Sequence, residues 1–342
     1  PIHVDRRHLA DGRARAVIAN SGNANACAPN GEENAERMCA AAAAAIGCAP
    51  EDVLVSSTGV IGQTLNVQVI ENGIPELCRT LVHSAEGSDA AAHAIMTTDT
   101  VKKEAAVETS IGGKIVRIGG IAKGSGMIHP NMGTMLCFLT TDCDISSEMI
   151  REALLEVTRV SFNRISVDGD TSTNDTCLVL ANGLAGNPSI TSQGADYDAF
   201  LEALRALCVE MARRIAADGE GAKHMITCTV EGATDEAQAE RIAKSVISST
   251  LTKAAIFGAD ANWGRVLCAM GYSGEAFDPD KVDVAVCAQG RGLDFDEEAA
   301  KRILTEHDVT IAVAMGEGNG ACTCWGCDIT YDYIKINGDY RT

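Results

Sequence analysis

A glycine-rich stretch that runs directly into an apolar segment is the strongest local pattern in this chain. Residues 119–133 hold five glycines, which adopt backbone angles that other residues resist, and Pro130 fixes one turn. The stretch is therefore expected to be loop up to Gly133. Residues 134–140 are mostly apolar and predict a buried strand. The Gly133–Thr134 bond is thus expected where a constrained loop meets a rigid strand.

This junction suits self-cleavage by a hydroxyl group. The Thr134 hydroxyl could attack the carbonyl of Gly133, which has no side chain to obstruct the approach, and water would cleave the resulting ester. Cleavage would leave Thr134 as a new N-terminus whose α-amine has a pKa of about 7.7–8.0. Such an amine acts as a general base beside its own hydroxyl. From these residues alone, an ordinary loop entering a core strand is the commoner interpretation.

A second hydroxyl follows another predicted strand, residues 52–57. The chain there runs into Thr58 and Gly59, whose hydroxyl and backbone N–H could stabilise an oxyanion during acyl transfer. The same two residues, taken alone, also fit a tight turn.

Seven segments occur in the order of one known family's signatures and reach from residue 20 to residue 342. They are residues 20–27 (NSGNANAC), 57–62 (STGVIG), 97–100 (TTDT), 123–136 (KGSGMIHPNMGTML), 167–175 (VDGDTSTND), 218–222 (DGEGA) and 336–342 (INGDYRT). The ordered set resembles the ornithine acetyltransferase family, also called glutamate N-acetyltransferase or the arginine-biosynthesis bifunctional protein. Each segment is moderately specific, and the ordered set is very specific.

The resemblance implies an enzyme that moves acetyl from N2-acetylornithine to glutamate by double displacement through an acetyl-Thr134 ester. Some members also use acetyl-CoA to make N-acetylglutamate, and neither reaction needs a metal or a cofactor. Self-cleavage would give an α chain, residues 1–133, and a β chain, residues 134–342. The two chains are expected to stay together as one catalytic unit and to pair as an α2β2 heterotetramer in the cytoplasm.

The resemblance also implies a role for each site residue. Thr134 is expected to be the nucleophile, with cleavage between Gly133 and Thr134, and Thr58 and Gly59 are expected to stabilise the oxyanion. The positions that match substrate-binding residues are Thr97, Lys123, Thr134, Glu220, Asn337 and Thr342. One departure is Gly133, where the family commonly has Ala. Relative to the family, a few tens of residues are also expected to be absent before Pro1.

The predicted elements alternate irregularly and include a hairpin, which favours a layered α+β fold. Strands are expected over residues 15–19, 52–57, 134–140, 176–181, 226–231, 282–288, 309–314 and 328–336, and a hairpin over 107–118 that turns at 112–113. Helices are expected over residues 31–46, 68–83, 146–160, 198–217, 235–251 and 295–306. The resemblance implies an αββα-like sandwich of mixed sheets with a smaller lobe at roughly residues 235–325.

Composition excludes several partners. The chain has 28 Lys and Arg against 47 Asp and Glu, a net charge of −19, which argues against nucleic acid or an anionic membrane as the main partner. Its 14 Cys without regular spacing predict reduced thiols in a cytosolic protein. The chain begins without a signal-peptide pattern, and its longest alanine run, residues 40–45, is too short to span a bilayer.

Two clusters invite a metal interpretation and neither fits it well. Asp168, Asp170 and Asp175 miss the EF-hand spacing, so residues 163–175 are expected to form a hydrogen-bonded loop near the site. The 322–327 run (CTCWGC) lacks an obvious fourth zinc ligand, so ordinary reduced thiols beside a strand are expected.

Two other functions stay open beside the acetyltransferase. One is an N-terminal-nucleophile aminopeptidase of related architecture. The other is a non-catalytic binding protein that kept the fold.

Overall fold

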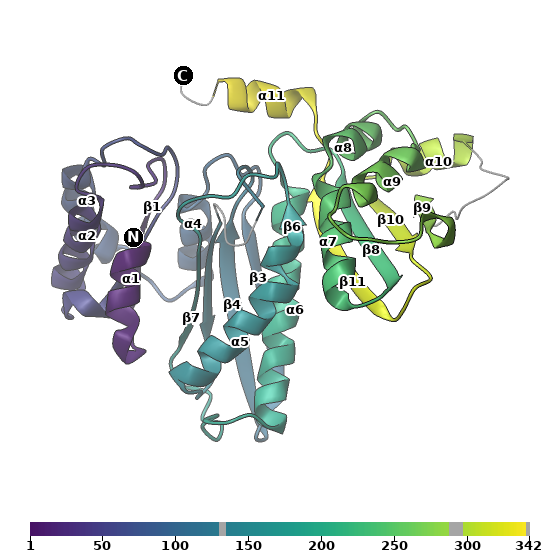
Figure 1. Cartoon of the computed structure of the whole chain (residues 1–342). Helices are drawn as coiled ribbons and strands as arrows, with labels where there is room; N and C mark the ends of the chain where they lie inside the picture. The colour runs from purple at the N-terminus through teal and green to yellow at the C-terminus, as the bar shows by residue number, and fades with distance from the viewer. Residues whose placement is uncertain (130–134, 287–296, 340–342) are drawn as a thin grey trace. The chain divides into compact units, whose positions relative to one another are not determined.

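A computed structural model of the chain describes residues 1–129, 135–286 and 297–339. These residues divide into two compact units. Unit 1 comprises residues 1–124, 132–160 and 172–211, and unit 2 comprises residues 125–131, 161–171 and 212–342. Figure 1 shows the helices and strands of both units. Within the described ranges, no helix is long and apolar enough to cross a membrane.

The first part of unit 1 is a two-stranded parallel sheet covered by helices. Its elements are α1 (Ile2–His8), β1 (Ala16–Asn20), α2 (Gly31–Ile46), β2 (Val53–Ser57), α3 (Val67–Arg79) and α4 (Ala85–Ala94), with β1 paired to β2. All five residues of β2 are buried, and Met38 and Ile74 bring α2 and α3 into the same hydrophobic core. This core places the C-terminal end of β2, where Thr58 follows, at a fixed point.

The second part of unit 1 is a four-stranded mixed sheet in the order β3-β4-β5-β7. Its elements are β3 (Lys103–Ile111), β4 (Lys114–Lys123), β5 (Leu136–Thr141), α5 (Ser147–Val160), β7 (Thr176–Ala181) and α6 (Ala195–Ala217), whose last residues belong to unit 2. The β3–β4 hairpin turns at Gly112 and Gly113, which both have positive φ, as the sequence predicts. Strand β4 pairs antiparallel with β5, and β5 pairs parallel with β7.

Unit 2 is built on a five-stranded mixed sheet in the order β6-β11-β8-β10-β9. Its elements are β6 (Ile165–Ser166), β8 (Met225–Ala233), α7 (Glu236–Ser248), α8 (Thr250–Phe257), α9 (Trp263–Gly271), β9 (Asp283–Val286), α10 (Glu297–Ile303), β10 (Asp308–Ala314), β11 (Gly320–Cys327) and α11 (Tyr331–Gly338). Apolar residues of α7, among them Ile242 and Val246, share one core with Val230 and Ile311 of the sheet. The α+β class with mixed sheets is thus confirmed.

The prediction that residues 119–123 are loop is wrong. They complete β4, where Gly120 lies opposite Ala105 of β3 and Leu139 of β5. A Cβ on Gly120 would lie 2.3 Å from Cδ2 of Leu139, so this glycine permits close packing inside a sheet rather than a turn.

The strand predicted over residues 328–336 is also wrong. The sheet takes β11 before it, and Thr330 then caps helix α11 by accepting hydrogen bonds from the N–H groups of Asp332 and Tyr333. The alternating aromatic and aliphatic residues of this segment resemble a strand, but Tyr331 and Ile334 are exposed on the helix.

Several helix boundaries differ from the prediction. The helix expected over residues 68–83 ends at Arg79 and contains Pro75, the helix expected from residue 198 begins at Ala195, and no helix was expected at α4. The helix expected over 235–251 is divided by a cap at Ser249, whose side chain accepts from the Thr252 N–H to start α8. Asn30 precedes α2 in a left-handed conformation, and its side chain makes no cap bond with the described residues.

Candidate active site

The bond predicted to be cleaved lies between two paired strands. Gly133 and Thr134 fall outside the described residues, as does the predicted substrate residue Thr342. On either side of them, β4 ends at Lys123 and β5 begins at Leu136, and these two residues are partners in the antiparallel ladder. The end of β4 and the start of β5 are therefore paired with each other, and the predicted nucleophile lies in the segment of sequence that connects them.

Two predicted site residues meet where β2 and β4 end. The Lys123 side chain is buried, and its Nζ donates a hydrogen bond to Oγ1 of Thr58 over 3.3 Å. Thr58 is itself buried, and its N–H donates to the carbonyl of Asn20 over 3.0 Å. Because the lysine donates, the Thr58 hydroxyl keeps its own hydrogen for another acceptor.

Gly59 stands at a point of close backbone approach. Its φ is +128°, and a Cβ built there would lie 2.2 Å from the carbonyl carbon of Gly22. The 20–25 loop is held against residues 58–60 by reciprocal bonds, in which the Ala24 N–H donates to Val60 and the Val60 N–H donates to Gly22. The Asn-rich loop thus packs directly beside Thr58.

A buried carboxylate connects the predicted residues Thr97 and Lys123. Asp99 Oδ1 accepts from Nζ of Lys103 over 2.6 Å and from the Gly124 N–H over 2.7 Å, and its Oδ2 accepts from the Thr97 N–H over 3.1 Å. Burial acts to raise the pKa of Asp99, but the charges of Lys103 and Lys123 outweigh it and lower that pKa. Sequence reasoning missed Asp99, although it is the one acid of the TTDT motif.

The loop predicted near the site ends in Asn174 and Asp175, which bind the backbone at Ser57, Ala24 and Met135. Asn174 donates from Nδ2 to the carbonyl of Ser57 over 3.1 Å and also to that of Ala24. Asp175 accepts the Met135 N–H at Oδ1 over 2.7 Å. Burial raises the pKa of Asp175 to about 7, against the bond from Met135 and the charge of Lys123, which lower it. The hydrogen-bonded loop is confirmed for residues 167–175, whereas Ile165–Ser166 form β6. Asp175 is a buried acid that sequence reasoning gave no role.

Unit 2 brings together the predicted residues Glu220 and Asn337. Nδ2 of Asn337, near the end of α11, donates to Oε2 of Glu220 over 2.7 Å. The Glu220 N–H donates to the carbonyl of Ser125 over 2.9 Å, and the Ser125 hydroxyl donates to the carbonyl of Asp218 over 2.7 Å. The Glu220 side chain is buried, so its carboxylate is a fixed acceptor rather than a solvated turn acid.

The segment after β4 is fixed in unit 2 by two acids. A Cβ on Gly126 would lie 2.2 Å from the carboxyl carbon of Glu220, so only glycine lets the backbone pass so close. Asp168 accepts the N–H groups of Met127 and Ile128 over 2.6 and 3.0 Å, and burial raises its pKa. Met127 has a φ of +56°, an uncommon angle for a side chain of this kind, and these bonds hold it there.

The cysteines of the 322–327 run lie within β11 rather than beside it. Sγ of Cys322 and Sγ of Cys324 are 3.9 Å apart on one face of the strand, and Cys327 is buried at its end. Among the described residues, no group of three or more His, Cys, Asp or Glu side chains could hold a metal ion.

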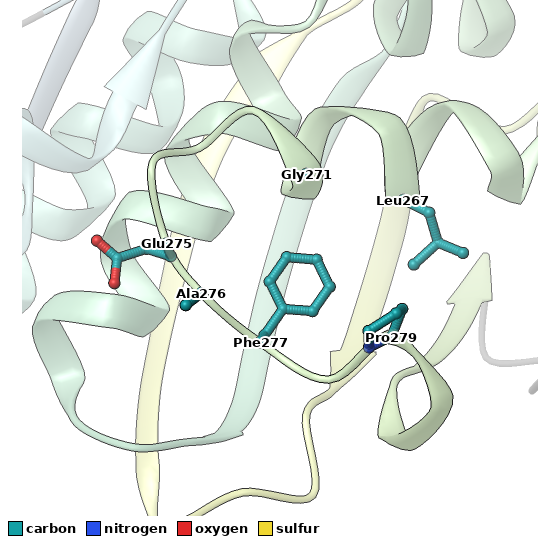
Figure 2. Close-up of a pocket in the computed structure, with 6 residues that line it drawn as sticks. All are labelled: Leu267, Gly271, Glu275, Ala276, Phe277 and Pro279. Carbon is teal, nitrogen blue, oxygen red and sulfur yellow. The ribbon is translucent and has the colours of Figure 1, made fainter.

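The pocket drawn in Figure 2 lies elsewhere in unit 2. It has a volume of about 360 Å³ and is lined by Leu267, Gly271, Glu275, Ala276, Phe277 and Pro279, with the Phe277 ring in its middle. Its one charged residue, Glu275, pairs with Arg241. None of the predicted site residues that the structure describes lines it.

Comparison with known proteins gives a consistent result. The model of the ArgJ family matches residues 1–342. The arginine biosynthesis bifunctional protein ArgJ of Symbiobacterium thermophilum is 51% identical over 100% of this chain and 86% of its own length. That of Bacillus subtilis is 47% identical over 100% of this chain and 85% of its own length. A crystal structure of the protein of that name from Bacillus halodurans is 45% identical and superposes with a TM-score of 0.56 over 59% of this chain and 97% of its own.

Proposed function

The chain belongs to the ArgJ family, and we propose from this that it transfers an acetyl group from N2-acetylornithine to glutamate in arginine biosynthesis. The observation that carries the proposal is the buried contact between Lys123 and Thr58, two residues from distant segments, at the strand end that precedes the predicted nucleophile. Both side chains are buried, and burial of a lysine costs free energy unless other groups compensate for its charge.

The reaction begins with cleavage of the Gly133–Thr134 bond. The α-amine of Thr134 then takes the proton of its own hydroxyl, and the hydroxyl oxygen attacks the acetyl carbonyl of acetylornithine. The C–N bond breaks, the departing amine takes the proton, and an acetyl-Thr134 ester remains. The amine of glutamate attacks that ester, and the Thr134 oxygen recovers a proton as N-acetylglutamate leaves.

Unit 1 supplies the groups that face the acetyl carbonyl. The Thr58 hydroxyl and the Gly59 N–H stabilise the negative charge that develops on the carbonyl oxygen. Lys123 is buried, and it pairs with a substrate carboxylate beside Thr97. Asp99 orients both residues, since it holds the backbone at Thr97 and at Gly124.

The distal amine is assigned to Glu220, whose carboxylate binds the second ammonium of ornithine. Asn337, which donates to Glu220, and Thr342, which lies outside the described residues, complete the substrate-binding set. The set needs no metal or cofactor, and acetyl-CoA is a further acetyl donor in this proposal. The two cleaved chains remain associated, pair as α2β2 and work in the cytoplasm.

The proposal is tested with acetylornithine supplied without glutamate. Mass spectrometry should then find one acetyl group on the N-terminal residue of the 134–342 chain, and glutamate should remove it. A Thr134→Ala variant should stay uncut and unlabelled. Initial-rate lines that intersect instead of running parallel would contradict double displacement, and release of amino acids from small peptides would favour an aminopeptidase.

A further inference from the structure

Two cysteines of β11 lie close together on one face of the strand. Cys322 and Cys324 are both free thiols, and their Sγ atoms are 3.9 Å apart. Cys324 is fully buried, whereas Cys322 is 4% exposed and directly follows the exposed Ala321. Cys322 is therefore the thiol of this pair that a small oxidant reaches first.

The groups around the pair make its two thiols chemically different. The hydrogen bond with Cys324 and the charge of Arg164 lower the pKa of the Cys322 thiol. Burial and the carboxylates of Glu236 and Glu240 act to raise that pKa, and they raise it by less. The shared hydrogen bond and burial hold the pKa of Cys324 well above its usual range. Because the thiolate is the nucleophile, Cys322 is the more reactive of the two.

Arg164 is fixed beside the pair by the sheet. It directly precedes β6, whose Ile165 is the ladder partner of Trp325 in β11. Arg164 is itself buried and pairs with Glu236 of α7, so its guanidinium is held in place rather than free in solvent. The cation that favours the Cys322 thiolate is thus part of the fold.

A second close pair of cysteines, in unit 1, has different surroundings. Cys137 of β5 and Cys177 of β7 are partners in the parallel ladder, and Cys137 is fully buried. Their hydrogen bond and burial hold the pKa of Cys137 well above its usual range. The groups that act on Cys137 are the thiols of Cys177 and Cys208 rather than a cation. The two pairs therefore share proximity and differ in the guanidinium.

We propose that Cys322 and Cys324 are a redox modification site, at which a peroxide produces a reversible disulfide. The thiolate sulfur of Cys322 attacks one oxygen of hydrogen peroxide, the O–O bond breaks, and the departing hydroxide takes a proton to become water. The sulfur of Cys324 then attacks the sulfenic acid of Cys322 and loses its proton, and a second water leaves. Two thiols and one peroxide give one disulfide and two waters. The inference does not depend on the proposed function.

The position of both cysteines in a strand makes this disulfide readily reducible. Cys322 lies opposite Val230 and Cys324 opposite Cys228 in the ladder with β8. An extended strand places alternate Cα atoms about 6.4–6.8 Å apart, at the upper limit of the roughly 4.4–6.8 Å that a disulfide allows. Closing the bond therefore distorts β11, and strained disulfides are the labile ones.

The test maps oxidised cysteines in the purified, reduced protein. Samples are treated with hydrogen peroxide and denatured, free thiols are alkylated, and peptides are identified by mass spectrometry. Cys322 and Cys324 should lose their alkylation at least about 10-fold faster than Cys137 and Cys177, and dithiothreitol should restore it. Cys327, whose pKa burial raises, should stay alkylated and serves as a control within the same strand.

Two variants test the roles of the individual groups. In Cys324→Ser, Cys322 should stop at the sulfenic acid, which dimedone traps, because the second thiol is missing. Arg164→Gln removes the charge and should slow the oxidation of Cys322 severalfold. Arg241→Gln is the matched control, because it removes an exposed arginine of α7 that pairs with Glu275, and it should oxidise at the wild-type rate.

The outcomes decide the inference without reference to acetyl transfer. If Cys322 keeps its thiol while the exposed Cys27 and Cys268 are oxidised, or if it bonds to a cysteine other than Cys324, the inference is overturned. Equal rates for the β11 pair and for Cys137 with Cys177 would also overturn it, because proximity alone would then govern oxidation. If a variant does not fold, the map of the wild-type protein still decides.

Discussion

Within each unit, some of the predicted site residues are buried charged side chains. Lys103 and Lys123 are among the largest fully buried side chains of the described residues, and Asp99 and Glu220 are buried as well. Burial of a charge costs free energy unless a partner compensates for it. Asp99 has its partners in Lys103 and in the charge of Lys123, whereas Glu220 accepts from the neutral amide of Asn337. Glu220 is therefore a residue whose buried charge a cationic substrate group would compensate.

Thr58→Ala should lower turnover and leave folding intact. The substitution removes one donor to the oxyanion, which typically reduces kcat by about 10²–10³-fold. Ser56→Ala is a matched control on the same strand, because Ser56 is fully buried and its Oγ has no hydrogen-bond partner among the described residues. Steady-state kinetics with acetylornithine and glutamate measure kcat of both variants. Circular dichroism checks that both variants fold. Normal kcat in Thr58→Ala would remove Thr58 from the site.

Glu220→Gln should weaken acetylornithine binding more than glutamate binding. Glutamine keeps an oxygen for the Asn337 amide but loses the charge that meets the δ-ammonium, and a hydrogen bond to a charged group contributes about 1.5–3 kcal/mol, or about 10- to 10²-fold in affinity. The loss should shrink with acetylated donors that lack the δ-amine. Asp218→Asn is the control for a neighbouring acid. Equal losses for donors with and without the amine would make Glu220 structural.

Strand β4 is the element on which the position of Lys123 depends. It is paired on both sides, by β3 and by β5, and its last residue is Lys123. The β3–β4 turn at the other end of the strand fixes the register, because a shift of one residue would turn every side chain to the opposite face. The side chain of Lys123 thus faces Thr58 only while the hairpin keeps its register.

Gly112→Ala should destabilise the protein more than Gly113→Ala. Both residues have positive φ, at +55° and +77°, so either alanine pays a strain of about 1 kcal/mol. A Cβ on Gly112 would also lie 2.3 Å from Cδ of Pro188, whereas nothing lies within 4 Å of one on Gly113. Overpacking should add about 1–3 kcal/mol. The two melting temperatures measure the difference, and equal values would mean that the Pro188 segment moves aside freely.

The two chains that the proposed cleavage produces are expected to stay together. The proposed cut lies between β4 and β5, which share an antiparallel ladder from Ile118 opposite Thr141 to Lys123 opposite Leu136. Strands β3 and β4 would belong to one product, and β5 and β7 to the other, so the four-stranded sheet would hold residues from both. In Figure 1 these strands run side by side.

The two products should therefore elute together from a native sizing column and separate only under denaturing conditions. The uncut Thr134→Ala chain should elute at the same volume, because the sheet is the same in both. Separation of the 1–133 and 134–342 chains without denaturant would show that the β4–β5 ladder is not enough to hold them.

The sequence by itself determined the family and most of the local structure. The ordered motifs identified the family that the comparison confirms, and glycine pairs and apolar periodicity predicted the β3–β4 hairpin, α2, α5 and α6. These features depend on residues close together in the chain, so the sequence carries them directly. Gly133, Thr134 and Thr342 lie outside the described residues, and their roles stay predictions.

Only the tertiary structure decided which residues meet and which local patterns were misleading. Residues 119–123 look like loop because of their glycines, yet sheet pairing on both sides makes them strand. Residues 328–336 look like strand, yet β11 already fills the place beside β8 and Thr330 starts a helix. The contacts of Asp99 with Gly124 and of Asp175 with Met135 join segments far apart in sequence, and no local pattern records such a contact.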